Sequence, residues 1–170
     1  MHRRFMLACA PVLALSACGF QLRQAPDFAF RSIYVVLLPT VKTSALAEEL
    51  KRAMASTGKV QVLTEARQIA TADVVLDVLT DQREKVVVGV SASGQVREFQ
   101  LRVRLKFRLR TPQGKDLISD TELLQQRDFS FNETAALAKE VEEAMLYRSM
   151  QSDLVQQVMR RLAAVRDAAT

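Results

Sequence analysis

The sequence is poor in the side chains that enzymes use for nucleophilic catalysis and for zinc binding. Its 170 residues contain one histidine, His2, and two cysteines, Cys9 and Cys18. His2 and Cys9 lie in an N-terminal segment that we expect to be removed, and Cys18 lies at the boundary of that segment. Without histidine or a free thiol, the mature chain has no Ser-His-Asp triad, Cys-His dyad, ordinary zinc site or disulfide. No carboxylate stands isolated among apolar residues as a general acid or base would. We therefore expect no enzyme, no catalytic residue, no metal and no cofactor.

Residues 1–17 have the order of parts of a secretory signal peptide. Arg3 and Arg4 form its positive start, and the apolar run 5–15 is too short to span a bilayer. The residues that follow resemble the bacterial lipobox, in which the cysteine is joined to diacylglycerol and, after cleavage, acylated with a chain such as palmitate: Leu15, Ser16, Ala17 and Cys18. We expect cleavage after residue 17 and a lipid on Cys18.

A lipidated Cys18 would hold the mature chain on a membrane. Each buried methylene contributes about 0.8 kcal/mol, and several acyl chains anchor almost irreversibly. The residue after the cysteine is Gly19 and not aspartate, which is typical of lipoproteins sent to the outer membrane. Residues 18–31 contain Pro26 and show no clear period, so we expect a tether there and a single domain over 32–170.

The most regular stretch of the chain is residues 99–110, FQLRVRLKFRLR, where apolar and basic side chains alternate. A period of two predicts a strand with one buried face. The apolar members are Phe99, Leu101, Val103, Leu105, Phe107 and Leu109. The basic members, which we call the cationic ladder, are Arg102, Arg104, Lys106, Arg108 and Arg110. Neighbouring residues on one face of a strand lie about 6.6–6.8 Å apart, so these five positive charges repel one another unless negative charges pair with them.

Two interpretations of the cationic ladder are open. In the first, acids on neighbouring strands answer it, each pair contributing about 0.2–1 kcal/mol. The acids of suitable parity are Asp77, Asp81, Asp120 and Glu122. In the second, a positive remainder, with Lys85 and Arg97 near loop 91–94, attracts anionic lipid or acidic protein. Nucleic acid is not expected, because a secreted protein rarely meets it and the ladder lacks the interleaved aromatics of a single-strand binder.

The rest of the chain predicts an α+β fold. Strands are expected at residues 32–38, 60–63, from 72 onward, at 99–110 and, after a turn at 111–114, at 115–128. A first helix is capped by Thr43 or Ser44 and ends at Gly58. The pattern indicates two helices packed on one face of a four- to five-stranded, mostly antiparallel sheet whose other face is open.

The second helix closes the chain. No glycine or proline occurs from Phe131 onward, so this helix has room for some thirty residues, and its cap is Ser130 with Glu133 or, alternatively, Asn132. Apolar residues trace a stripe along it that we expect to be core: Leu137, Val141, Ala144, Met145, Leu154, Val158, Leu162 and Val165.

The chain resembles the LptE family of lipopolysaccharide-assembly lipoproteins at three separated places. Residues 18–23, CGFQLR, are similar to that family's Cys-Gly-aromatic-x-Leu-Arg start. Residues 131–143, FNETAALAKEVEE, resemble its closing-helix entry, with Lys139 ending an Ala-Leu-Ala-Lys core. Residues 94–100 resemble its Gly-Gln turn followed by an aromatic-Gln strand.

The resemblance implies a plug within the β-barrel of LptD that helps the barrel assemble and binds lipopolysaccharide during delivery to the cell surface. It implies lipopolysaccharide contact by a loop cation and by Lys139. Ala92 occupies the loop position, where Arg97 or Lys85 is the substitute. The candidate lipopolysaccharide-binding residues are therefore Lys139, Arg97, Arg102, Arg104, Lys106 and Arg108. The alternative is a structural outer-membrane lipoprotein that binds only a protein partner and pairs its cations internally.

Overall fold

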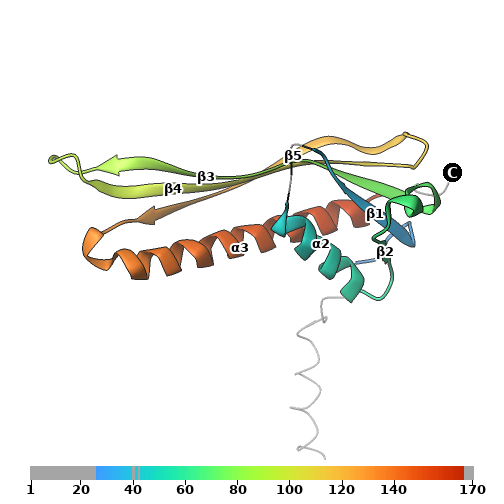
Figure 1. The fold of residues 1–170 in the computed structure, drawn as a ribbon, viewed down its shortest axis with the longest axis horizontal. Coiled ribbons are helices and arrows are strands. Elements are labelled where there is room, and N and C mark those ends of the chain that lie inside the picture. The colour runs from blue at the N-terminus through green and yellow to red at the C-terminus, as the bar shows by residue number, and fades with distance from the viewer. Residues whose placement is uncertain (1–25, 40, 42, 167–170) are drawn as a thin grey trace, which may run out of the picture.

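The computed structural model describes residues 26–39, 41 and 43–166 (Figure 1). The predicted signal peptide 1–17, the lipid attachment at Cys18 and the tether up to residue 25 lie outside these residues. The described residues form one sheet and two main helices, which confirms the α+β class.

The sheet has five strands in the order β2-β1-β3-β4-β5. Their bounds are β1 Ser32–Leu37, β2 Gln61–Leu63, β3 Val74–Val90, β4 Val96–Arg110 and β5 Asp116–Ser130. β1 pairs in parallel with β2 and β3, while β3, β4 and β5 form a long antiparallel meander. The sheet is therefore mixed, because the helix between β1 and β2 carries the chain back before the second strand begins.

Helix α2 (Ala45–Ser56) follows β1 and precedes β2 in the sequence. Its N-cap is Ser44, whose Oγ accepts a hydrogen bond from Ala47 N at 2.8 Å, and Gly58 follows its end with φ of +66°. Helix α3 (Ala136–Ala163) has 28 residues, or about 42 Å of length. A short 3₁₀ turn, η3 (Glu133–Ala135), precedes it, and its cap is Asn132, whose Oδ1 accepts from Thr134 N at 3.1 Å.

Both helices cover the same face of the sheet, and no described element covers the opposite face, which we call the bare face (Figure 1). The core lies between the two layers. The apolar members of β4 from Leu101 to Leu109 are at most 1% exposed, as the period of two predicted. Side chains of this size contribute about 1.5–3 kcal/mol each when fully buried.

The apolar stripe of α3 divides into two parts. Leu154, Val158 and Leu162 are completely buried, as expected. Leu137, Val141 and Met145 are instead 80%, 59% and 54% exposed, so the prediction that they are core is wrong. Helix α2 contacts α3 at Gln151, whose Nε2 donates to Ala45 O at 3.3 Å. Nearer its start, α3 turns the polar side chains of Lys139 and Glu143 toward the sheet, and these three apolar residues lie on an outer side that no described element covers.

The molecule is elongated and has two ends, which we call the distal end and the basal end (Figure 1). The distal end holds the β3–β4 turn and the start of α3, and the basal end holds the start of β1, the β4–β5 turn and the end of α3 (Figure 1).

Candidate functional site

The cationic ladder lies on the bare face of the sheet, and most of its members form ion pairs with Asp or Glu side chains. Arg110 and Arg108 both donate to Asp77, with Nε to Oδ2 at 2.8 Å and Nη2 to Oδ2 at 2.9 Å respectively. The remaining pairs are Lys106 with Asp120 at 3.0 Å, Arg104 with Glu122 at 3.8 Å and Arg108 with Asp116 at 3.8 Å. The first interpretation of the ladder is therefore right for four of its five members.

Two members of the ladder keep unused donors. Arg102 Nε donates to Gln100 Oε1 at 2.7 Å, and no carboxylate of the described residues lies within 4 Å of it. Arg104 Nε is shielded from solvent and has no hydrogen-bond partner within the part of the chain that the structure describes.

Asp77 is the buried centre of the ladder's charge network, with 3% of its surface exposed. Burial alone would raise the pKa of its carboxyl. Hydrogen bonds from Arg110 and Arg108, together with their charges, outweigh burial and hold the pKa below its usual range.

A β-bulge separates Asp81 from the ladder. The register shifts between Val78 and Thr80, so Asp81 pairs with Leu105 and lies on the helix face. There its Oδ2 accepts a hydrogen bond from Ser44 Oγ at 2.6 Å. The prediction that Asp81 answers the ladder is wrong, because one extra residue reverses the parity of everything after it.

The same shift places Arg83 and Lys85 on the helix face, opposite the polar side of α3. Arg83 bonds Gln151 and lies 5.5 Å from the centroid of the Tyr147 ring. Tyr147 donates to Glu84 O at 2.9 Å. Burial raises the pKa of Tyr147, and the Glu143 carboxylate adds to that effect.

Two lysines and three phenyl rings meet at the distal end. We call this group the distal cluster: Lys85, Phe99, Phe129, Phe131 and Lys139. Lys85 Nζ lies 4.2 Å from the Phe99 centroid and 5.8 Å from that of Phe129, and Lys139 Nζ lies 5.4 Å from the Phe129 centroid. Phe99 stacks on Phe129 at 6.1 Å and meets Phe131 edge-on at 5.3 Å. Cations over ring faces are attracted by the ring quadrupole.

Each lysine of the distal cluster is also held by one carboxylate of α3. Lys85 pairs with Glu143 at 2.6 Å and Lys139 with Glu142 at 2.8 Å. Lys139 donates further to Ser130 Oγ at 3.2 Å. The two ammonium groups are therefore fixed in place, with side chains 34% and 19% exposed.

Arg97 lies next to the distal cluster. Its carbonyl accepts from Phe131 N at 2.8 Å, and Arg97 lines a small hollow of about 190 Å³ with Asn132 and Thr134. Its Nη2 donates to Gln95 at 3.3 Å, and no carboxylate of the described residues lies within 4 Å. Ala92 is exposed in the adjoining turn.

The predicted site residues thus fall on opposite faces of the sheet. Lys139 and Arg97 lie on the helix face with Lys85, and the four ladder residues Arg102, Arg104, Lys106 and Arg108 lie on the bare face. The ring trio was missed as a part of the site. Its signal was present, because Phe129 and Phe131 lie two residues apart at the end of the strand that pairs with the Phe99 strand.

Exposed apolar side chains occur at the distal end, on both faces of the sheet and on the outer side of α3. On the sheet they are Val86, Val87, Val88 and Val90, and on α3 they are Leu137, Val141 and Met145. No helix in the described ranges is long and apolar enough to cross a membrane. In those same ranges, no three His, Cys, Asp or Glu side chains converge as metal ligands would.

Comparison with known proteins decides the family. The model of the LptE lipopolysaccharide-assembly family matches residues 30–162. The chain belongs to the LptE family. It is therefore a lipopolysaccharide-assembly lipoprotein and not an enzyme.

Solved structures of lipoproteins share this LptE fold. Lipoprotein B of Nitrosomonas europaea is 32% identical with a TM-score of 0.72, over 86% of this chain and 91% of that one. The minor lipoprotein of Acinetobacter baumannii, 23% identical over 82% and 96% of the two chains, has a TM-score of 0.63. The rare lipoprotein B of Shewanella oneidensis, 19% identical over 79% and 95%, has a TM-score of 0.61. The last two show the fold alone. No curated protein matches the chain.

Proposed function

We propose that this LptE-family chain is an outer-membrane lipoprotein, anchored through Cys18 on the periplasmic side. In this proposal it plugs the LptD β-barrel, helps that barrel assemble and binds lipopolysaccharide during delivery to the cell surface. The observation that carries the ligand is the distal cluster. Family membership supports the role in assembly.

The distal cluster has the two chemistries that lipopolysaccharide requires. The phosphates of lipid A are targets for Lys85 and Lys139, and charge-assisted contacts to phosphate are stronger than neutral hydrogen bonds. Acyl chains are matched by the partly exposed rings of Phe99 and Phe131 and by exposed Val87, which pairs with Phe99 on the same face of the sheet. A bound phosphate would replace Glu142 or Glu143 as the partner of a lysine that is already in position.

Arg97 is the nearest further contact in this proposal, because it reaches solvent beside the cluster without a carboxylate partner among the described residues. On the bare face, Arg102 has no carboxylate partner among the described residues and remains a candidate. Arg104 is a weaker one, because it pairs with Glu122 and its Nε is shielded from solvent. Lys106 and Arg108 are weaker candidates, since a ligand would first have to displace Asp120, Asp77 or Asp116.

The exposed half of the α3 stripe supports a protein partner. Leu137, Val141 and Met145 line up one turn apart on a side that no element of the described residues covers. Aligned exposed apolar residues commonly mark interaction sites. A plug is enclosed by its barrel, so this stripe and the bare sheet face are the two surfaces that we assign to the barrel wall.

Purification of the affinity-tagged, lipidated protein from outer membranes tests the proposal. We expect a β-barrel protein of the LptD type at a stoichiometry near one to one, together with lipopolysaccharide. A stoichiometric barrel without lipopolysaccharide, combined with no binding of purified lipopolysaccharide, would support the protein-only alternative. Absence of a barrel would contradict the plug.

A further inference from the structure

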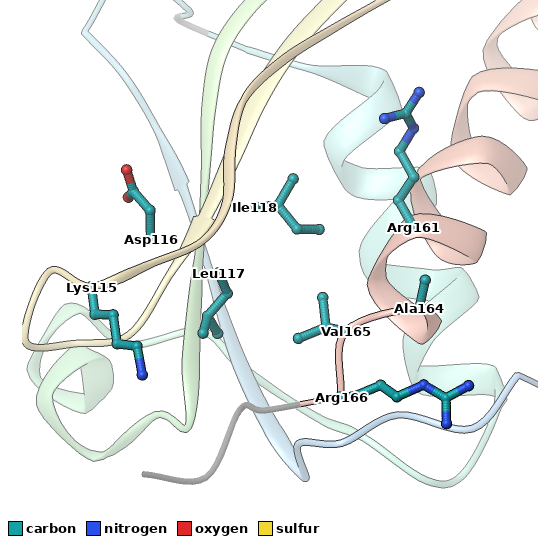
Figure 2. Close-up of a pocket in the computed structure, with 8 residues that line it drawn as sticks. All are labelled: Lys115, Asp116, Leu117, Ile118, Arg161, Ala164, Val165 and Arg166. Carbon is teal, nitrogen blue, oxygen red and sulfur yellow. The ribbon is translucent and has the colours of Figure 1, made fainter.

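The basal end carries a basic cleft that the proposed function leaves unused. Figure 2 shows it between the start of β5 and the end of α3, with Ile118 and Val165 projecting into it. Its volume is about 550 Å³. Lys115, Arg161 and Arg166 stand around this apolar lining on three sides (Figure 2).

These cations are not neutralised by the described part of the chain. None of its carboxylates lies within 4 Å of Lys115, Arg161, Arg166 or the neighbouring Arg160. The one acid at the cleft, Asp116, lies on the other side of β5 and pairs with Arg108 (Figure 2). Arg160 and Arg161 complement the negative end of α3, but Lys115 comes from a different element.

The strand register places the cleft at the end where the chain enters the fold. Ile33 of β1 pairs with Val74, the neighbouring Val75 pairs with Arg110, and Arg110 pairs with Asp116. Three steps between strands, of about 4.8 Å each, therefore separate the start of β1 from the start of β5 by about 14 Å.

The length of the tether limits how far this end can be from the membrane. Pro26 is the first described residue, and residues 18–25 precede it. A fully extended chain of eight residues spans at most about 29 Å. An acylated Cys18 therefore holds the basal end within about that distance of the bilayer surface.

We propose that Lys115, Arg160, Arg161 and Arg166 form a contact surface for the anionic phospholipid leaflet that holds the anchor. The guanidinium and ammonium groups contact headgroup phosphates, and the apolar cleft receives one lipid of that leaflet. The inference rests on the proposed lipid attachment at Cys18. It also orients the domain, because α3 then carries the distal cluster about 40 Å away from that leaflet.

Vesicle binding of the unanchored protein tests this surface. The probe is the mature chain with Cys18→Ser, floated with vesicles of three parts phosphatidylethanolamine to one part phosphatidylglycerol, or with pure phosphatidylcholine. We expect binding to the anionic vesicles only. A basic residue near such a surface contributes about 1 kcal/mol, or about fivefold. The triple change Lys115→Gln, Arg161→Gln and Arg166→Gln should therefore reduce binding about a hundredfold.

A matched control removes the same charge from the bare sheet face. The variant Arg102→Gln, Arg104→Gln and Lys106→Gln should lose less than about threefold of its vesicle binding. Equal losses in both variants would show a general attraction of a basic protein and overturn the assignment, as would an unchanged basal variant. Binding of purified lipopolysaccharide, measured on the same proteins, separates failure of this inference from failure of the proposed function.

Discussion

Lys85 and Lys139 approach the ring of Phe129 from two elements that are far apart in the sequence. Their Nζ atoms lie 5.8 Å and 5.4 Å from its centroid, one reaching from β3 and the other from α3. Each has its own carboxylate partner, so the two like charges are tolerated near one ring. The arrangement exists because the bulge before Thr80 moves Lys85 to the helix face.

Asp77 is expected to be the most costly acid to remove from the bare face. Asp77→Asn leaves Arg108 and Arg110 without their buried partner, and we expect the free energy of unfolding to fall by about 1–3 kcal/mol. The loss stays below the 3–5 kcal/mol of fully buried pairs because both guanidiniums reach solvent. Urea denaturation measures it. The control Asp120→Asn removes an exposed pair and should cost about 0.5 kcal/mol or less.

Acid should destabilise the protein through the same carboxyl. The pKa of Asp77 is lower in the folded chain than in the unfolded chain, where it is about 3.9. Its contribution is therefore complete above that value and is lost as pH falls toward the folded-state pKa. Urea midpoints between pH 6 and pH 2.5 should fall more steeply for the parent protein than for Asp77→Asn. Parallel curves would contradict a lowered pKa.

Ser44 joins the cap of α2 to the acid that the bulge displaced. Ser44→Ala removes the bond to Ala47 N and leaves Asp81 without its hydroxyl donor. We expect a loss of about 1–3 kcal/mol in unfolding free energy, since a cap alone contributes about 1 kcal/mol. Thr43→Ala, one residue earlier at an exposed position, is the control and should change little.

The two halves of the α3 stripe should respond in opposite ways. Leu137→Gln with Val141→Gln alters exposed residues, so the unfolding free energy should stay within about 0.5 kcal/mol while recovery of the barrel partner falls. Leu154→Ala should cost about 2–5 kcal/mol because it opens a cavity in the core. Full recovery of the barrel by the double variant would remove this stripe from the interface.

Sequence periodicity correctly predicted the strand and helix that depend on local pattern. It failed for side chains whose face of the sheet depends on the strand register. The alternation from Phe99 to Arg110 correctly predicted a strand with one buried face, and Ser44 and Gly58 bounded α2. The bulge at Leu79 has no signature in the residues themselves, so Asp81 was assigned to the wrong face.

The exposed half of the stripe failed for a different reason. Apolar spacing identifies a face of a helix but not what covers it. The first residue of α2 lies beside Gln151, and Leu137 and Val141 stay exposed. The same limit applied to the site. Lys139 was found through the resemblance to the LptE family, whereas its neighbours Lys85 and Phe129 are set by packing between α3 and the sheet.

Binding of purified lipopolysaccharide to two charge-matched double variants tests the central claim most directly. Lys85→Gln with Lys139→Gln removes two charges from the distal cluster, and Lys106→Gln with Arg108→Gln removes two from the ladder. Measured at one salt concentration on folded protein, the distal variant should bind at least tenfold more weakly than the parent, while the ladder variant stays within about threefold. Parent-like affinity in the distal variant, or a larger loss in the ladder variant, would contradict the assignment of lipopolysaccharide to the distal cluster.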